Sequence, residues 1–407
     1  MASRQSQQLH FLCTVKVLIL HQHFKTPYRG GAIRSYYLAK ALQDRGVQVD
    51  VIAGHDERER KEILEGITIH YLKVPYDNNY GFGKRIFSFI QFVYKAKRKI
   101  KHLSQFDLCY AISVPLTVGL IALWIKRKRA TPYVFEVGDL WPEAPIQMGV
   151  ISNGVVKKLL YALEKKIYAS ARSIVALSPA IKASIEITVP KKKVTLLPNM
   201  SDTEFFGKSV KGLAIENKYG VKGKFVVSYL GAIGEANGLD YFIEIANVSR
   251  KAELPVHFII CGEGAHKPRL VKLVETLMLK NITILDFTNR DGVKEILNIT
   301  DACFISYKPV PILETGSPNK YFDALASGKL VIINFGGWIR TEIEKDQCGI
   351  FVDPYQPYEF TTKIRAFIED PGMLEDYQSR ARSLAERKYS RKELGERFYK
   401  VITERAE

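Results

Sequence analysis

The sequence predicts an α/β fold of two doubly wound, Rossmann-like domains that face a central cleft. Short apolar runs alternate with longer amphipathic stretches from residue 15 onward, which implies right-handed crossovers and parallel sheets covered on both faces. The pattern starts again at "FVVSYLGAIG", and 407 residues are too many for one ordinary domain. Ligands of open parallel sheets bind at the carboxyl ends of the strands, so the cleft is the expected place of function.

The first domain is predicted over residues 1–205. Its expected strands are, in chain order, "KVLIL", "VQVDVIAG", the segment near 67–72, "DLCYAI", "PYVFEV", "SIVALS" and "VTLLPN". Amphipathic stretches predict helices near 31–45, over 83–101 and near 115–127. A polar stretch without a clear period, "GKSVKGLAIENKYGVKGK", then separates this domain from the next.

The second domain is predicted over residues 206–387. Its expected strands are "FVVSYL", "VHFIIC", "ITILDF", "ACFISY", "KLVIINF" and "GIFVD". Helices are expected over "GLDYFIEIANVSRK", near 267–279, near 291–299 and over "SPNKYFDALASGK". The closing segment is charged and helical, and its last helix, about 388–407, could pack back on the first domain.

Cysteine usage and hydropathy exclude several classes of protein. The five cysteines are scattered and lack a C-x-x-C pair, which predicts reduced core residues rather than a disulfide framework or a zinc site. They are Cys13, Cys109, Cys261, Cys303 and Cys348. "VKVLIL" is too short for a secretory signal, and "VPLTVGLIALWI" is too short for a membrane span. We therefore expect a folded, cytoplasmic chain that does not cross a bilayer.

The formal net charge of +17 favours an anionic partner: nucleic acid, anionic lipid or a phosphorylated small molecule. No nucleic-acid-binding module is recognisable, so nucleic acid is not an expected partner. The basic helix over 83–101 has an apolar stripe widened by aromatic residues, which suits a helix resting on an anionic membrane surface. A solvated helix with a broad core face is the alternative. The stripe is Ile86, Ile90, Val93 and Ile100, and the aromatic residues are Phe87, Phe89, Phe92 and Tyr94.

The segment "SPNKYFDALASGK" combines helix start and stop signals. Ser317 is expected to cap the helix, Pro318 to take its first position and Gly328 to end it, which predicts a helix over about 318–327.

The start of this helix is a predicted anion site. The backbone N–H groups of Asn319 and Lys320 would point at a bound phosphate, helped by the helix dipole and the lysine charge. Asp323 lies one turn further on the same face, where its carboxylate can accept hydrogen bonds from a ribose diol. A simple ion pair between Lys320 and Asp323 is the alternative.

Three motifs, "SPNKYFDALASGKLVI", "YLGAIGEANGLDYFIEIA" and "FIICGEG", together resemble the retaining glycosyltransferases of family 4, which have the GT-B fold. "VGDLWPEAP" is similar to a branch of that family that builds bacterial surface polysaccharides such as lipopolysaccharide and capsule. The resemblance implies transfer of a hexosyl or N-acetylhexosaminyl group from a nucleotide-diphosphate sugar to an acceptor hydroxyl, with net retention. No cofactor is implied, and the sequence lacks the Asp-x-Asp of a metal-chelated donor. The basic helix adds a lipid-linked or oligosaccharide acceptor at the inner face of the cytoplasmic membrane.

The family signature pairs two acids seven residues apart, ahead of a glycine. Aligning Gly328 places Asp323 at the second acid, to which the resemblance assigns the donor ribose. Gly316 stands at the first, so Glu314 is the candidate substitute near the catalytic centre.

A glycine loop after the first strand of the second domain resembles the family's diphosphate site. Many members carry arginine and lysine where this chain has Ala232 and Asn237, so Lys320 and Arg34 are expected to supply the positive charge. A second loop, "RGG", resembles the family's substrate-facing loop. The residues assigned to nucleotide-sugar binding are Gly30, Gly31, Arg34, Gly231, Gly234, Asn237, Gly262, Ser317, Asn319, Lys320 and Asp323.

In "EVGDLWPE", many members carry histidine where this chain has Gly138. Asp139 and Glu143 are therefore the acids expected near the acceptor hydroxyl or donor sugar, together with Glu314; a capping role for Asp139 is the alternative. His21 and His23 could line the cleft, but without further ligands they make a poor metal site.

Two other functions stay open on the sequence. A nucleotide-sugar 2-epimerase would share the two-domain cleft, but it would need dedicated acids and histidines around the sugar and no acceptor. A non-catalytic scaffold that binds nucleotide-sugar or lipid would explain the missing first acid and the missing loop cations.

Overall fold

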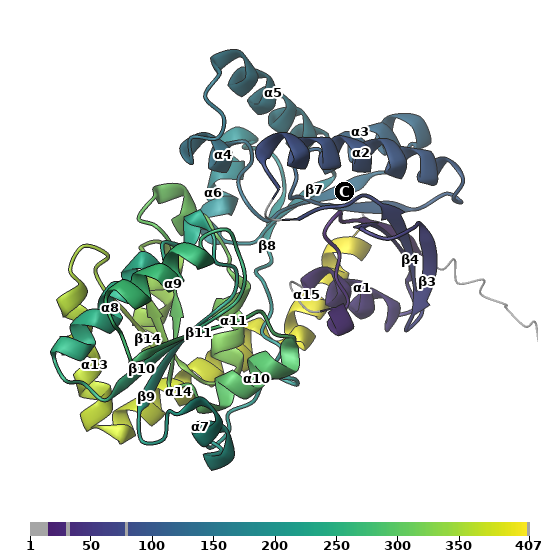
Figure 1. The fold of residues 1–407 in the computed structure, drawn as a ribbon. Coiled ribbons are helices and arrows are strands. Elements are labelled where there is room, and N and C mark those ends of the chain that lie inside the picture. Colours follow the sequence, from purple (N-terminus) through teal and green to yellow (C-terminus); the bar gives the residue numbers. More distant parts are fainter. Residues whose placement is uncertain (1–14, 30–32, 78–79, 405–407) are drawn as a thin grey trace, which may run out of the picture.

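The computed structural model describes residues 15–29, 33–77 and 80–404. It contains two sheets, each with helices on both faces, so the predicted α/β fold class is confirmed (Figure 1). The sheet built from the first half of the chain lies at the upper right of Figure 1, and the other sheet lies at the lower left.

The first sheet has eight strands, mostly apolar runs that are buried on both faces, as expected where helices cover a parallel sheet. The strands are β1 (Lys16–Leu20), β2 (Gln48–His55), β3 (Arg60–Leu64), β4 (Ile67–Lys73), β5 (Leu108–Ile112), β6 (Tyr133–Val137), β7 (Ser173–Ala176) and β8 (Val194–Leu196). Their order across the sheet is β3-β4-β2-β1-β5-β6-β7-β8. The helices are η1 (Pro27–Arg29), α1 (Arg34–Gln43), α2 (Phe82–Lys101), α3 (Val118–Arg129), α4 (Glu143–Gln147), α5 (Gly154–Ser170) and α6 (Pro179–Thr188).

The second sheet has six strands, all parallel, in the order β11-β10-β9-β12-β13-β14. They are β9 (Phe225–Leu230), β10 (Val256–Cys261), β11 (Ile282–Leu285), β12 (Ala302–Ile305), β13 (Leu330–Ile333) and β14 (Gly349–Phe351). The helices are α7 (Leu213–Tyr219), η2 (Glu235–Asn237), α8 (Asp240–Lys251), α9 (Lys267–Thr276), α10 (Arg290–Ile299), η3 (Pro311–Thr315), α11 (Asn319–Ala326), α12 (Trp338–Lys345), α13 (Pro357–Glu369) and α14 (Pro371–Leu384).

One edge of the first sheet departs from the predicted parallel arrangement. Strand β3 pairs with β4 in antiparallel register. The two strands are joined by Glu65 and Gly66, with φ of 47° and 83°, which is the backbone of a tight type I′ hairpin. The prediction of a wholly parallel sheet is therefore wrong at this edge, because a two-residue turn can return the chain only antiparallel.

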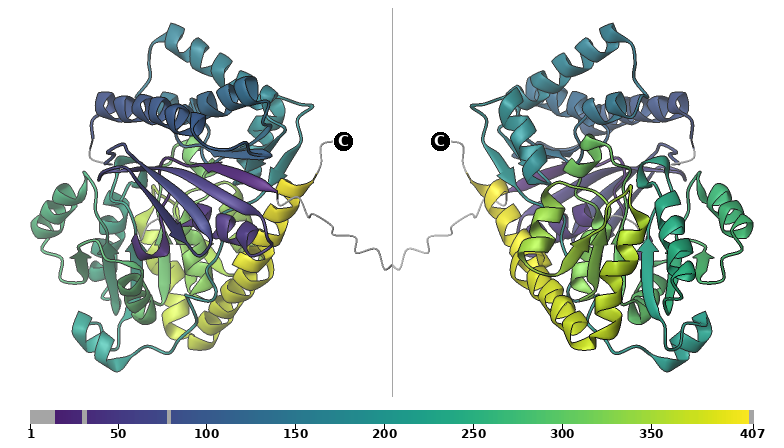
Figure 2. Two further views of the ribbon diagram at one scale, coloured as in Figure 1. Left: turned by 90° about the vertical axis from the view of Figure 1, so that its right-hand side faces the viewer. Right: turned by 90° about the vertical axis from the view of Figure 1, so that its left-hand side faces the viewer.

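The end of the chain lies against the first sheet's helices. After η4 (Ala385–Tyr389), α15 (Arg391–Thr403) packs on α1. The ring of Phe398 lies 4.7 Å from that of Tyr110 on β5, and Glu396 forms an ion pair with Arg45. Figure 2 shows this helix, in yellow, beside the purple N-terminal strands. The chain therefore crosses between the two sheets twice.

Helix α2 separates its apolar residues into two faces. Phe89, Phe92 and Ile100 are buried against the sheet. Phe87 and Ile90 are exposed by 66% and 59%, so the predicted apolar stripe is divided, with Ile100 in the core and Ile90 on the surface. Among the described residues, no helix combines the length and the apolar character that a membrane span requires.

Candidate active site

Two glycine loops follow the neighbouring strands β9 and β10 and press against each other. The N–H of Gly231 donates to the carbonyl of Cys261 over 2.9 Å. A Cβ on Gly262 would lie 1.8 Å from the Gly231 carbonyl oxygen, so only glycine fits there. The structure thus brings Gly231 and Gly262 together as one backbone surface at the carboxyl ends of these strands.

The rest of the first loop is held by its own side chains. Asn237 Oδ1 accepts a hydrogen bond of 3.2 Å from the Gly234 N–H. Glu235 forms an ion pair with Lys308 and contacts the His266 Nε2 at 2.8 Å. Asn237 therefore stabilises the loop, a role that its side-chain amide can fill without any ligand.

Lys320 lies against this loop. A Cβ on Gly231 would be 3.3 Å from the Lys320 Nζ. The ammonium donates to the Tyr229 hydroxyl over 2.5 Å and sits 3.9 Å from the centre of that ring. No carboxylate pairs with it among the described residues, and burial lowers the pKa of Lys320 to about 7. A buried cation without a counter-ion is suited to receive an anionic ligand.

Helix α11 begins one residue later than predicted. Its N-cap is Pro318, and no side chain caps it, so the prediction that Ser317 caps the helix is wrong. Ser317 is instead tied to Asn199, whose N–H donates to the serine Oγ over 3.5 Å and whose amide donates to the serine carbonyl. Gly328, with φ of 59°, ends the helix in the left-handed conformation as predicted.

The first turn of α11 has backbone N–H groups without a hydrogen-bond acceptor in the described part of the chain. Among the described residues no group accepts a hydrogen bond from the backbone N–H of Asn319 or Lys320. Asn319 is exposed. These N–H groups and the Lys320 ammonium belong to the same helix start, which is the arrangement that binds phosphate at helix N-termini.

Asp323 lies one turn further along α11. No described residue donates a hydrogen bond to its carboxylate, and it forms no ion pair with Lys320. Burial raises the pKa of Asp323 to about 7; the charge of Arg290 opposes this change and that of Asp202 adds to it. The simple ion-pair interpretation is therefore not supported, and the carboxylate is open to a donor from a ligand.

Arg34 is placed differently from its prediction. It is buried and pairs with Glu136 at 3.0 Å, and it donates to the carbonyl of Leu197 at 2.8 Å and to that of Pro198. These three partners hold the guanidinium inside the first sheet's core, so the structure does not support Arg34 as the cation that compensates a diphosphate. Gly30 and Gly31, which precede it, lie outside the described residues.

Asp139, directly after β6, has an exposed side chain without a hydrogen bond to any described residue, which does not support the capping alternative. Desolvation by the surrounding protein raises its pKa. Tyr307, which follows β12 in the other sheet, has its pKa raised by burial and by the charge of Asp139. The two side chains are therefore close enough for the charge of Asp139 to act on the Tyr307 hydroxyl across the two domains.

The other two predicted acids are engaged elsewhere. Glu143 accepts hydrogen bonds from Tyr161 and, over 2.7 Å, from Gln147. Glu314 accepts a bond of 3.3 Å from the N–H of Gly336, just before α12. Of the three acids proposed for catalysis, Asp139 alone is left with a free carboxylate in the described part of the chain.

The two histidines after β1 are neutral. Burial lowers the pKa of His21 to about 3 and that of His23 to about 4. His21 Nδ1 bonds the Ser35 hydroxyl at 2.8 Å, and His23 packs 4.3 Å from the ring of Tyr76. Within the described ranges no group of three or more His, Cys, Asp or Glu residues could hold a metal ion.

Three residues of the site escaped the sequence analysis. Tyr229 lies near the end of β9 and Tyr307 shortly after β12; an aromatic residue next to an apolar strand is normally core, so no local signal distinguishes them. Arg290 is the first residue of α10; it pairs with Asp202 at 2.6 Å and so connects α10 to the segment that links the two domains.

The fold and these loops define a class: glycosyltransferases with the GT-B architecture. The model of the "Glycosyl transferase 4-like domain" matches residues 29–200, and that of "Glycosyl transferases group 1" matches residues 214–384. The two matches follow each other and cover most of the chain. This protein belongs to family 4 of the glycosyltransferases.

Two curated relatives match in part. Alpha-D-kanosaminyltransferase of Streptomyces kanamyceticus is 21% identical over 221 residues, which are 53% of this chain and 55% of the relative. The putative colanic acid biosynthesis glycosyl transferase WcaI of Escherichia coli K12 is 26% identical over 207 residues, 49% of this chain and 50% of the relative. The matched part of the chain spans about half the length of these relatives.

A solved structure shows the same fold over most of the chain. HepE from Anabaena, crystallised with UDP-glucose, superposes with a TM-score of 0.68 at 16% identity and covers 95% of this chain and 99% of its own.

Proposed function

We propose that this protein transfers a sugar from a nucleotide-diphosphate donor to an acceptor hydroxyl with retention at the anomeric carbon, without a metal ion. The observation that carries the proposal is the Lys320 ammonium, which lies against Gly231 with no counter-ion among the described residues. In the transfer, negative charge develops on the leaving diphosphate, and a preorganised cation with open helix N–H groups stabilises it. The UDP-glucose bound to HepE supports a nucleotide-sugar donor.

The remaining site residues take roles around that diphosphate. Asp323, one turn along α11, accepts hydrogen bonds from the donor ribose. Asp139 and Tyr307 lie where the acceptor hydroxyl and donor sugar would meet, between the two sheets. Glu143 and Glu314 stay in their hydrogen bonds and do not contact the substrate. They affect the site only by holding in place the segments that they bond to.

Calorimetry with a panel of nucleoside diphosphates and nucleotide-sugars tests this donor site. One nucleoside diphosphate should bind to the wild type, and Asp323→Ala should weaken it by more than about 1 kcal/mol, the scale of a hydrogen bond to a charged group. Asp376→Ala, an exposed acid on α14, is the matched control and should bind as the wild type does. If nothing in the panel binds, the donor assignment fails.

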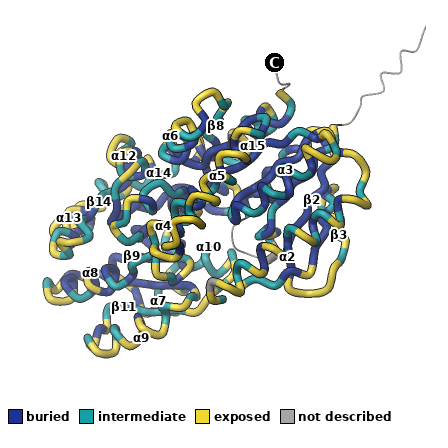
Figure 3. Tube along the Cα trace, turned by 90° about the horizontal axis from the view of Figure 1, so that it is seen from above, coloured by how far each residue is buried: buried dark blue, intermediate teal, exposed yellow. Residues whose placement is uncertain are grey.

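We further propose that the acceptor is lipid-linked and that the protein works at an anionic membrane surface in surface polysaccharide synthesis. Helices α2, α3 and α5 lie along one side of the first sheet, and Figure 3 shows this side from above (Figures 1 and 3). Phe87 and Tyr94 on α2 and Val155 and Leu159 on α5 are exposed by 66% or more. Basic residues at the ends of α2 and α3 add attraction to anionic lipid. The colanic acid role in the name of WcaI supports this setting.

Vesicle sedimentation at low salt tests the membrane part. The wild type should sediment with anionic vesicles and release at high salt, because the attraction is partly electrostatic. The triple variant Phe87→Ser, Ile90→Ser, Tyr94→Ser should lose binding. Val210→Ser, an exposed apolar residue of the other domain, is the control. Wild-type protein that stays in the supernatant with anionic vesicles would remove this part of the proposal.

A further inference from the structure

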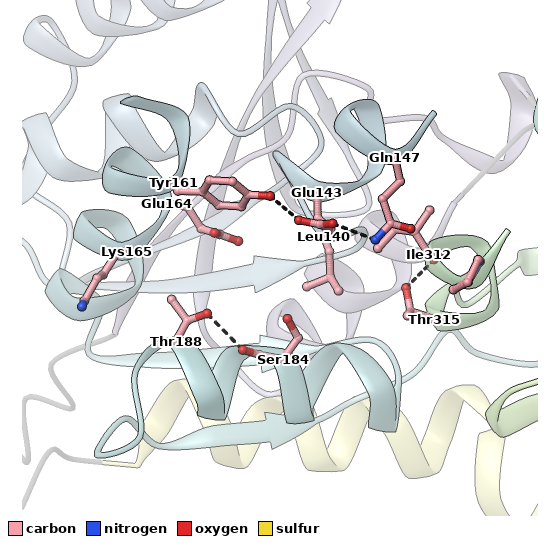
Figure 4. A pocket seen from close by; sticks show the side chains of 11 residues that line it. Leu140, Glu143, Gln147, Tyr161, Glu164, Lys165, Ser184, Thr188, Ile312 and Thr315 are labelled. Atoms are coloured by element: carbon pink, nitrogen blue, oxygen red, sulfur yellow. Dashed lines mark hydrogen bonds between the residues drawn. The ribbon is translucent and has the colours of Figure 1, made fainter. Parts of the chain in front are cut away.

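A pocket of about 490 Å³ lies beside the candidate site, between α4, α5 and α6 of the first domain and η3 of the second (Figure 4). Its size is within the range of small-molecule sites. Leu140 and Thr315 line it. They are the immediate chain neighbours of Asp139 and Gly316, so the pocket adjoins the candidate site along both domains.

The polar wall of the pocket is rich in hydrogen-bond acceptors. Glu143 and Glu164 both line it. Lys165 lines it too, but neither this lysine nor any other lysine or arginine among the described residues pairs with either carboxylate. Glu164 is only 7% exposed. Burial raises its pKa to about 7, a hydrogen bond with Tyr168 opposes this change and the charge of Glu143 adds to it. Two acceptor-rich groups in one small pocket favour a ligand with several hydroxyl donors and disfavour an anion.

Apolar side chains also line the pocket. Leu140, Pro311 and Ile312 are among them, and the ring of Tyr161 lies on the α5 side (Figure 4). The Tyr161 hydroxyl donates to Glu143, so the ring is held in place by its polar end. A sugar ring has this same division, because its hydroxyls lie around an edge and its C–H groups form an apolar face.

We propose that this pocket binds one sugar ring of the acceptor, away from the hydroxyl that receives the transferred sugar. The inference rests on the proposed transferase function. Leu140, next to Asp139, and residues of η3 line the pocket. None of the groups placed at the donor diphosphate lines it. Binding a remote sugar here would anchor a multi-sugar acceptor while its terminal hydroxyl reaches the site between the sheets.

Saturation-transfer NMR on the full chain, with methyl glycosides of common hexoses and N-acetylhexosamines as probes, tests the pocket. At least one glycoside should bind to the wild type. Glu164→Gln should raise its dissociation constant by about tenfold, the size of one lost hydrogen bond to a charged group. Tyr161→Ala should raise it as well, because the apolar face of the sugar loses the ring that it packs on. Tyr161 is 38% exposed, so its truncation tests the pocket without opening the core. Lys166→Ala, exposed on α5 and outside the pocket, should bind as the wild type does.

Two further binding measurements, with methylammonium and with the nucleoside diphosphate, distinguish the possible outcomes. Methylammonium, a cation without hydroxyls, should not bind; a pocket that holds it and no glycoside is a cation site, and the proposal is then wrong. The same variants should keep wild-type affinity for the nucleoside diphosphate. Nucleotide binding without any glycoside binding would overturn the pocket alone, whereas glycoside binding without nucleotide binding would overturn the donor site and leave the pocket.

Discussion

Arg34 in the first domain and Lys320 in the second are both positively charged side chains at the start of a helix, and the two differ in what surrounds the charge. Arg34 begins α1 and is bound by Glu136 and two backbone carbonyls. Lys320 is the second residue of α11, and among the described residues it has only the hydroxyl and ring face of Tyr229 as partners. Arg34 keeps a raised pKa because Glu136 offsets its burial, whereas burial alone acts on Lys320 and lowers its pKa to about 7.

The comparison separates a structural cation from a ligand-binding one. Charge, burial and position at a helix start are alike in both, so none of them decides the role. The decisive feature is whether the protein itself supplies the counter-charge. Arg34 stabilises the first domain. Lys320 has no counter-ion among the described residues, so a bound diphosphate can neutralise its charge.

The largest expected effect is on the stability of the first domain. Arg34→Met leaves Glu136 buried without its cation and should lower the free energy of unfolding by about 3–5 kcal/mol. Chemical denaturation measures this loss. The double variant with Glu136→Gln should recover much of it, because no unpaired charge then stays buried. A single variant as stable as the wild type would show that Glu136 is not dependent on Arg34.

The second effect is on ligand affinity. Lys320→Met should weaken nucleoside diphosphate binding by about 1.5–3 kcal/mol, the scale of a hydrogen bond between charged groups, without lowering stability. Calorimetry across pH sharpens the test. Since the free ammonium loses its proton near pH 7, wild-type affinity should fall as pH rises above about 7, by at most about tenfold per pH unit.

The methionine variant should not show that fall, because it has nothing to titrate there. Stability should change in the opposite sense. The unfolded lysine holds its proton up to its ordinary pKa of 10.5 and the folded one only to about 7, so Lys320 contributes stability that grows as pH rises between these values. A wild-type affinity that does not change between pH 7 and pH 9 would contradict the assignment of Lys320.

The smallest effect concerns the residue that orients the lysine. Tyr229→Phe keeps the ring under the ammonium but removes the hydroxyl that accepts from Lys320 and donates to the Ala232 carbonyl over 2.6 Å. Diphosphate affinity should fall by about 0.5–1.5 kcal/mol, the net worth of one hydrogen bond. Binding as tight as that of the wild type would show that the ring alone positions Lys320.

Features of the site that depend on neighbouring residues could be predicted from the sequence. The end of α11 at Gly328 and the shared face of Lys320 and Asp323 follow from helix spacing within a dozen residues. The glycines at 231 and 262 are likewise local signals of close backbone approach.

Features that depend on distant partners could not be predicted. Arg34 and Glu136 are 102 residues apart, and no pattern in the sequence around Arg34 indicates that a buried carboxylate pairs with it. Ser317 fails as a cap because Asn199, 118 residues earlier, binds it. Glu143 turns toward Tyr161 only because α5 lies beside α4. Side-chain direction in these cases is decided by tertiary packing, which spacing along the chain does not encode.

The return of the chain's end to its first domain has a consequence for synthesis. Phe398 covers Tyr110, and the Ser201 N–H donates to the Tyr389 carbonyl over 2.8 Å where the two crossings run side by side. On a ribosome, the first domain therefore emerges without its last helix. Nearly two hundred further residues must be synthesised before that helix can cover the surface of the domain. The second domain can close on itself in that interval, so the domain that begins first is completed last.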